Sequence, residues 1–167
     1  MKDNTLIYSD IIKAVKTTAD AEDFLSQIDA LFAKLFKTTP GSFDENLKKI
    51  IGSNFAALLR ESLEKNNINK NDQSSIEKFL NGLKDYIQQL KILKLQIAFQ
   101  PSDEMIDDIF VWVSENIGQG IILDISYDIS LIGGAIITFE GKYRDLSLKK
   151  RFSDIFEKNG VLLKKPK

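Results

Sequence analysis

The sequence predicts an α+β protein, with an N-terminal up-and-down helical bundle over residues 1–90 and a small β-α-β-β-α domain over residues 91–167. Two observations lead to this prediction. Up to about residue 90, apolar residues recur at steps of three and four, which is the spacing of one buried helix face. Beyond Leu90, short runs rich in Ile, Leu and Phe and one stretch of strict alternation appear, and both are typical of strands.

Four helices are expected in the first domain. A short helix is predicted from Ile7 to Val15, and a longer one ends at the break formed by Thr39, Pro40 and Gly41. The apolar face of the longer helix consists of Phe24, Ile28, Leu31, Phe32, Leu35 and Phe36. Because each amphipathic helix needs another apolar surface to cover its own, the helices are expected to pack as a bundle.

The third and fourth helices are each expected to begin at a capping box, in which a Ser and a Glu three residues later satisfy free N–H groups. The first box is Ser42 with Glu45, and the second is Ser74 with Glu77. The third helix, with a bend expected near Gly52, carries Leu47, Ile50, Ile51, Phe55, Leu58 and Leu59. The fourth carries Ile76, Phe79, Leu80, Leu83, Ile87 and Leu90.

The second domain opens with a strand predicted from Ile92 to Phe99, which stops at Pro101. Ser102 is expected to cap the following helix, whose first turn carries Asp103 and Glu104 where acidic side chains complement the helix dipole. The apolar face of this helix consists of Ile106, Ile109, Phe110, Val113 and Ile117.

A half-buried strand is predicted beyond the turn at Gly118-Gln119-Gly120. Its residues alternate, with Leu123, Ile125, Tyr127 and Ile129 on one side and Asp124, Ser126 and Asp128 on the other. Ala135 to Phe139 forms the next strand, and Glu140-Gly141 turns the chain into a returning strand over Lys142 to Asp145. A basic helix closes the chain, with Leu148, Phe152, Ile155 and Phe156 on one face.

The composition excludes several kinds of active site. The 167 residues include no His and no Cys. The commonest general base at neutral pH and the commonest metal ligand are therefore missing, together with thiolate nucleophiles, disulfides and Cys-ligated metals. We expect no catalytic residue, no metal ligand and no bound cofactor, and hence a protein that is not an enzyme.

One acidic cluster leaves an enzymatic alternative open. Asp103, Glu104, Asp107 and Asp108 lie close together, and paired carboxylates can do acid–base work or hold a divalent ion. Their place in the first turns of a helix favours a solvated face instead. An enzyme that uses Asp103 and Asp107 with a divalent ion is the least favoured hypothesis. Trp112, beside this face, is either an exposed contact residue or part of the edge of the core.

Charge is balanced overall but uneven along the chain. The 23 Lys and Arg nearly equal the 24 Asp and Glu, yet residues 91–141 hold 2 basic and 8 acidic residues, and residues 142–167 hold 9 basic and 3 acidic. Either these segments neutralise each other, or the basic end faces an acidic partner or an anionic membrane. No stretch reaches the ~20 apolar residues of a membrane span, and the N-terminus does not resemble a secretory signal. A water-soluble cytosolic protein is expected.

Two sequence blocks in the second domain carry a resemblance to a known family. The first is Asp128-Ile129-Ser130-Leu131-Ile132-Gly133-Gly134; the second is Gly141-Lys142-Tyr143-Arg144-Asp145-Leu146-Ser147, followed by Arg151-Phe152 in the basic helix. Together they resemble the C-terminal signature of the delta subunit of bacterial F-type ATP synthase, the family of the mitochondrial oligomycin sensitivity-conferring protein. The strand around Lys94-Leu95-Gln96-Ile97-Ala98 and the helix after Pro101 also resemble that family, and Tyr8-Ser9-Asp10-Ile11-Ile12 is loosely similar to its opening motif.

The matching signature residues are Leu131, Ile132, Gly133, Gly134, Asp145 and Ser147, whose role in the family is structural. Leu146 departs from the pattern, because the family usually has Gly there. The resemblance implies a non-catalytic connector in the peripheral stalk, which links the catalytic α₃β₃ head to the b-subunit stalk and so couples proton-driven rotation to ATP synthesis.

The resemblance also implies partners. Residues 1–90 would bind the N-terminal segment of the ATP synthase alpha subunit, and residues 91–167 would bind the C-terminal ends of the b subunits. The chain would bind no nucleic acid and would lie at the cytoplasmic face of the cell membrane, peripheral to it through the complex. The alternative is a soluble α/β adaptor or a nucleic-acid-binding module unrelated to ATP synthase.

Overall fold

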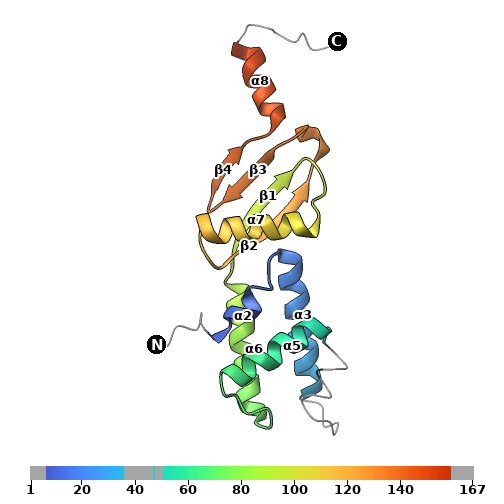
Figure 1. The fold of residues 1–167 in the computed structure, drawn as a ribbon, viewed down its shortest axis with the longest axis vertical. Coiled ribbons are helices and arrows are strands. Elements are labelled where there is room, and N and C mark those ends of the chain that lie inside the picture. Colours follow the sequence, from blue (N-terminus) through green and yellow to red (C-terminus); the bar gives the residue numbers. More distant parts are fainter. Residues whose placement is uncertain (1–6, 36–46, 48–50, 159–167) are drawn as a thin grey trace. The chain divides into compact units, whose positions relative to one another are not determined.

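The computed structural model describes residues 7–35, 47 and 51–158 (Figure 1). It contains both helices and a four-stranded sheet, which confirms the mixed helix-and-sheet class predicted from the sequence. The chain divides into two compact units, Met1–Leu90 and Lys91–Lys167. This division falls where the spacing of the apolar residues changes.

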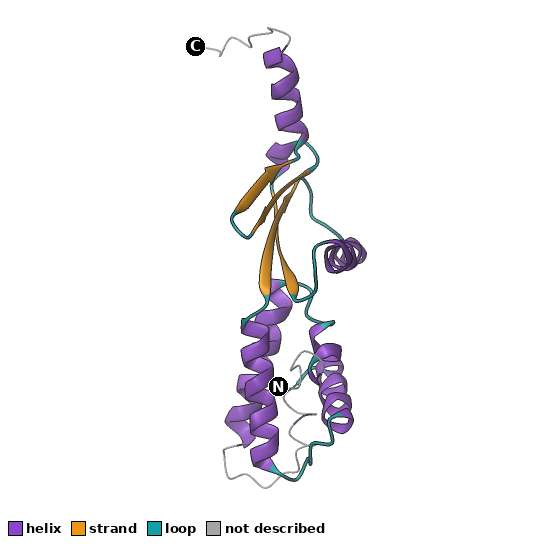
Figure 2. Ribbon diagram, turned by 90° about the vertical axis from the view of Figure 1, so that its left-hand side faces the viewer, coloured by secondary structure: helices purple, strands orange, loops and turns teal. Residues whose placement is uncertain are grey.

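The described part of the first unit is helical (Figure 2). Its helices are α2 (Ser9–Ile12), α3 (Thr18–Leu35), α5 (Ser53–Lys65) and α6 (Gln73–Gln88). Helix α3 packs against α6, and α2 packs against α5. The buried residues follow the predicted apolar faces and include Ile28, Leu31, Leu47, Ile51, Phe55, Leu59, Ile76, Phe79, Leu80, Leu83 and Ile87. Phe36, the side chain of Leu35 and the Ser42–Glu45 capping box lie outside the described residues.

Two helix starts in the first unit differ from the prediction. Gly52 is extended (φ −55°, ψ 144°) and directly precedes α5, so the helix expected to bend there is interrupted instead. Asp72, rather than Ser74, caps α6. Its carboxylate accepts bonds from the Ser74 N–H at 3.1 Å and the Ser75 hydroxyl at 2.5 Å. Asp72 directly precedes the helix, and its carboxylate accepts hydrogen bonds that the first turn would otherwise leave unsatisfied. Helix α6 therefore begins at Gln73.

The Tyr8 side chain lies against the backbone of α6 at Gly82. The Tyr8 ring is buried, with its centroid 5.1 Å from that of Phe79 and 6.0 Å from that of Tyr86. Burial, and then the nearby Asp85 carboxylate, raises the pKa of the Tyr8 phenol. A Cβ on Gly82 would overlap the Tyr8 hydroxyl oxygen. The contact between α6 and the Tyr8 side chain therefore depends on glycine at position 82.

We expect Gly82→Ala to lower the free energy of unfolding of the first unit by about 1–3 kcal/mol, because the added methyl overlaps the Tyr8 hydroxyl. Tyr8→Phe removes that oxygen, and the nearest remaining ring atom, Cζ, lies 3.3 Å from the added carbon. In the Tyr8→Phe background, Gly82→Ala should therefore lower the free energy of unfolding much less. The higher helix propensity of alanine compared with glycine acts in the same direction. Thermal unfolding by circular dichroism measures both effects, and strictly additive losses would contradict the contact.

The second unit is built around one mixed sheet. Its elements are β1 (Lys91–Ile97), α7 (Asp103–Asn116), β2 (Ile121–Tyr127), the 3₁₀ turn η1 (Ile129–Leu131), β3 (Ala135–Phe139), β4 (Lys142–Asp145) and α8 (Leu148–Lys158). The strand order is β2-β1-β3-β4, with β1 and β2 parallel and the other pairs antiparallel. Helix α7 connects the parallel pair, as a crossover between parallel strands requires.

Helix α7 covers one face of this sheet, and Figure 2 shows it end-on to one side of the strands. The core between them contains Leu93, Leu95, Ile97, Val113, Ile121 and Leu123, with Ile106, Ile109 and Phe110 packed against it. Ser102 caps the helix as predicted, and its hydroxyl accepts the Met105 N–H at 3.3 Å. Ile117, predicted to lie on the buried face, is instead exposed beyond the last residue of α7.

Strand β2 begins two residues before the predicted alternation and departs from that alternation at its far end. Ile121, Ile122 and Leu123 are all buried, and Tyr127 is exposed as the last residue paired with β1. Ile129, expected to point into the core, lies in η1 with 80% of its surface exposed. The reason is local, because the carboxylate of Asp128 accepts the Ser130 N–H at 2.8 Å and turns the chain away from the sheet.

Candidate interaction surface

The six signature residues meet at one junction of the second unit. The segment Leu131-Ile132-Gly133-Gly134 follows η1, and the segment Asp145-Leu146-Ser147 joins β4 to α8. The two segments are bonded through their backbones: the Leu146 N–H donates to the Ala135 carbonyl at 2.8 Å, and the Leu148 N–H donates to the Gly133 carbonyl at 2.9 Å. The junction therefore fixes the start of α8 to the loop before β3.

Of the two glycines of the junction, Gly134 is required by a close backbone approach, whereas Gly133 packs closely against a side chain. A Cβ on Gly133 would lie 2.7 Å from Cδ1 of Leu148. Gly134 has φ +76°, and a Cβ there would overlap the Leu146 carbonyl oxygen and lie 3.1 Å from the Cα of Ser147. A phosphate-binding role is not expected for this pair, since no glycine-rich fingerprint surrounds it. The glycine pair allows the loop before β3 to lie directly against the segment from Leu146 to Leu148.

Asp145 and Ser147 start helix α8. The Asp145 carboxylate accepts the Ser147 N–H at 2.9 Å. The Ser147 hydroxyl accepts the Lys150 N–H at 3.2 Å, as an N-cap residue does, and only 1% of Ser147 is exposed. Leu146, where the family usually has Gly, does not have a positive φ. Leucine is therefore accommodated without strain, and its side chain is exposed.

Hydrogen bonds from Ser147 lower the pKa of Asp145, and hydrogen bonds from Ser130 likewise lower the pKa of Asp128. A carboxyl with a lowered folded-state pKa stabilises the fold above its unfolded pKa, about 3.9. That contribution is lost as the pH falls through the lower, folded value. We expect the second unit to lose stability below about pH 4, and Asp145→Asn to flatten this decline. Urea midpoints measured across pH 2–7 test the prediction, which fails if both proteins show the same decline.

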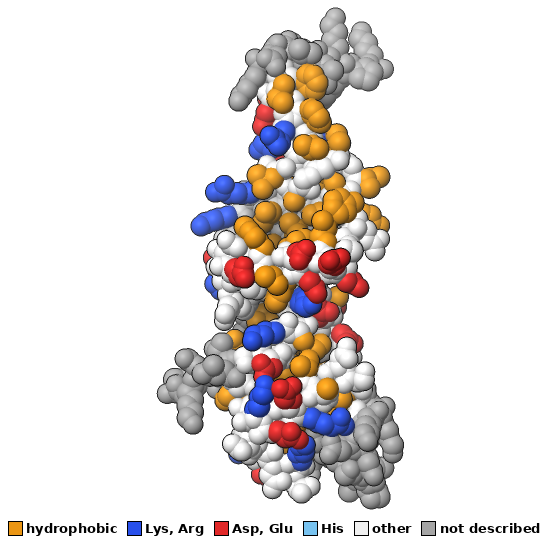
Figure 3. All heavy atoms as spheres, in the orientation of Figure 1, with side chains coloured by type: hydrophobic (Ala, Val, Ile, Leu, Met, Phe, Trp, Pro, Cys, Tyr) orange, Lys and Arg blue, Asp and Glu red, His pale blue; other side chains and the backbone are white. Residues whose placement is uncertain are grey.

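Helix α8 presents an apolar stripe to solvent. Leu148, Phe152, Ile155 and Phe156 recur with helical spacing and are all exposed, Ile155 by 51%. Beside them lie three more exposed apolar residues on the neighbouring segments, since η1 contacts α8. We call these seven residues the C-terminal apolar surface: Ile129, Ile132, Leu146, Leu148, Phe152, Ile155 and Phe156. Figure 3 shows hydrophobic side chains along α8 and over the adjoining end of the second unit.

The acidic cluster of α7 forms a charged surface, unlike the C-terminal apolar surface. Asp103, Glu104, Asp107 and Asp108 are all exposed on the helix, as the solvated-face interpretation predicts. Among the described residues, no three His, Cys, Asp or Glu side chains come together in a way that could hold a metal ion. Trp112 is 56% exposed, so it is a surface residue, and its role as a contact residue stays a prediction. An exposed tryptophan is a frequent contact residue in protein interfaces.

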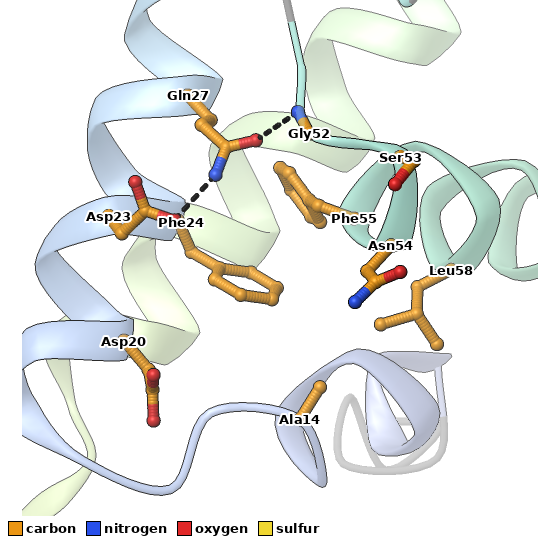
Figure 4. Close-up of a pocket in the computed structure, with 10 residues that line it drawn as sticks. All are labelled: Ala14, Asp20, Asp23, Phe24, Gln27, Gly52, Ser53, Asn54, Phe55 and Leu58. Carbon is orange, nitrogen blue, oxygen red and sulfur yellow. Dashed lines mark hydrogen bonds between the residues drawn. The ribbon is translucent and has the colours of Figure 1, made fainter.

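The first unit contains a cavity of about 400 Å³ that the sequence did not indicate (Figure 4). It lies between α3 and the start of α5, beside the Phe24 and Phe55 rings, whose centroids are 4.4 Å apart. Its polar groups serve the local fold. Gln27 accepts the Gly52 N–H at 2.9 Å and donates to Asp23 at 2.6 Å, and Asp20 accepts the Thr17 N–H at 2.9 Å.

Comparison with known proteins adds no assignment: no protein-family model matches the sequence, and no curated protein matches it significantly. Within the residues that the structure describes, no helix is both long enough and apolar enough to cross a membrane. The junction and the C-terminal apolar surface are thus the features from which a function is inferred. The junction is an internal contact of the fold, whereas the C-terminal apolar surface is exposed.

Proposed function

We propose that this chain is a non-catalytic connector of the peripheral stalk of an F-type ATP synthase. It would join the catalytic α₃β₃ head to the b-subunit stalk and so couple proton-driven rotation to ATP synthesis. The observation that carries the proposal is the junction. Gly133 and Gly134 lie against the segment from Leu146 to Leu148, so that the two sequence blocks of the family resemblance meet in one structural element.

The geometry supports a binding role for the second unit. The described part of the second unit ends in helix α8, whose apolar stripe is uncovered within the described chain, with Lys149 and Arg151 next to it in sequence. An exposed apolar patch of this kind marks a protein-binding face, and a helical partner laid along it is a common recognition mode. We assign this face to the C-terminal ends of the b subunits.

The first unit would bind the alpha subunit of the catalytic head. We propose that residues 1–90 form an up-and-down helical bundle that binds the N-terminal segment of the alpha subunit. A stalk has to resist the torque of the rotor, which calls for large static interfaces rather than a reactive pocket. A chain without His or Cys meets that need. Its place in the cell would be the cytoplasmic face of the membrane, held there through the complex.

Co-purification of the tagged full-length chain tests the proposal. We expect the alpha and b subunits to be recovered with it after cross-linking and membrane solubilisation. The control is the same chain carrying Phe152→Asp, which we expect to retain the alpha subunit and lose the b subunits. Recovery of RNA, or of unrelated proteins without any ATP synthase subunit, would contradict the proposal and favour the alternative of an adaptor or nucleic-acid-binding module.

A further inference from the structure

Ile132 has an unusual backbone conformation. Its φ is +66° and its ψ is −33°. Positive φ is rare for residues other than glycine and is a genuine outlier for a β-branched side chain, and this ψ also lies outside the left-handed helical region. The other non-glycine residues with positive φ in the described chain are Asn67 and Glu140. Asparagine tolerates this region, and Glu140 with Gly141 forms a two-residue hairpin turn that requires it.

The fold itself gains little from isoleucine at this position. The Ile132 side chain is 65% exposed, so little of it is buried against the unit that contains it. The conformation is set by the backbone, since the Ile132 N–H donates to the Ile129 carbonyl at 3.2 Å and the close-packed glycine pair follows. Glycine or asparagine would adopt the same turn with less strain. Strained residues of this kind cluster at functional sites.

The surroundings of Ile132 indicate what it contacts. It belongs to the C-terminal apolar surface, together with Ile129, Leu146 and the apolar stripe of α8. At ~100° per residue, Lys149 and Arg151 project from opposite edges of that stripe, whereas Asp154 and Glu157 project from the far side of the helix. An apolar stripe with basic residues on both edges is complementary to an apolar stripe with acidic residues on both edges.

We propose that Ile132 is the anchor of a docking surface for an amphipathic helix whose apolar stripe is bordered by acidic side chains. The inference deepens the proposed function and rests on it only for the identity of the helix as part of a b subunit. A protein helix fits better than an anionic bilayer, because the surface combines side chains from three separate segments in fixed positions. A bilayer takes up an amphipathic helix without needing a residue held at one fixed, strained position.

The test measures affinity and stability together on the full chain. The probes are two synthetic helical peptides with the same leucine stripe, one bordered by Glu and the other by Lys, and vesicles of phosphatidylglycerol and phosphatidylcholine. We expect the Glu-bordered peptide to bind at least about tenfold more tightly than the Lys-bordered peptide, and the vesicles not to bind. Ile132→Gly and Ile132→Asn should each weaken that binding about tenfold or more, with a Tm equal to or above that of the parent protein.

Two control variants make the result specific. Ile92→Ala removes an exposed apolar residue of β1 outside the surface and should leave the affinity unchanged. Ile129→Ala removes an exposed residue of the surface that does not have a positive φ, so it should weaken binding without raising the Tm. Equal binding of the two peptides, preference for the vesicles, or Ile132 variants with a lower Tm and unchanged affinity would each overturn the inference.

A peptide with the sequence of the C-terminal end of a b subunit, measured in parallel, separates this inference from the proposed function. If the Glu-bordered peptide binds through Ile132 but the b-subunit peptide does not bind, the docking surface stands and the proposed function fails. If the b-subunit peptide binds with the same affinity in the Ile132 variants, the proposed function stands and the anchor role of Ile132 is wrong.

Discussion

Replacing Gly134 with valine should lower the free energy of unfolding of the second unit by about 3 kcal/mol or more. Gly134 has φ +76°, which a β-branched residue adopts only with strain, and its Cβ would overlap the Leu146 carbonyl oxygen. To make room, the Leu146 segment has to move, which breaks the bond from the Leu146 N–H to the Ala135 carbonyl, 2.8 Å long. The start of α8 would then lose its attachment to the sheet.

Gly141→Val is the matched control. Gly141 has nearly the same φ, +75°, but nothing lies within 4 Å of the position of its Cβ. This variant therefore measures the conformational cost of the valine side chain alone, for which we expect about 1–2 kcal/mol. Trp112, the single tryptophan of the chain, lies in α7, so its fluorescence reports unfolding of the second unit. Equal urea midpoints for Gly134→Val and the parent protein would mean that the two backbone segments do not pack as described.

Phe152→Asp should weaken binding of the b-subunit peptide about 100-fold while leaving the Tm almost unchanged. Phe152 lies within the stripe of α8 and is exposed, so the substitution removes little from the fold. In a complex the same position would bury an unpaired carboxylate against apolar side chains, which is strongly unfavourable.

Ser153→Asp places the same charge one residue further along α8. Its side chain projects ~100° away from that of Phe152 around the helix, outside the line of the stripe. We expect it to weaken binding by no more than about threefold, an effect of the charge alone. Titration calorimetry on the full chain measures both variants. If Phe152→Asp bound the peptide as tightly as the parent protein, the surface would not be the docking site.

Much of the second unit was predictable because its signals are local. Ser102 caps α7, the Glu140-Gly141 turn joins β3 to β4, and α8 begins and runs as its spacing predicts. These features depend on residues within a few positions of each other. The interruption at Gly52 and the exposure of Ile129 were not predicted, because in each case a backbone conformation ends an apolar pattern that continues in the sequence.

The candidate site was predicted only in part. The resemblance implied a structural role for the glycine pair, and the structure shows what the pair approaches, the segment from Leu146 to Leu148. That contact joins the two ends of the β3–β4 hairpin, so it lies further apart in the sequence than the caps and turns that local patterns reveal. The apolar stripe of α8 was visible in the sequence, but its exposure was not, since periodicity does not reveal whether the covering surface belongs to the same chain. The strain at Ile132 has no sequence signal.

We propose that this chain holds a catalytic head and a stalk together. Membranes prepared from cells of the source organism that lack the chain test it most directly, by measuring how much alpha subunit stays bound to them. We expect the head to be released, and to bind again when the purified chain is added but not when the Phe152→Asp variant is added. Heads that remain attached and make ATP without the chain would contradict the claim.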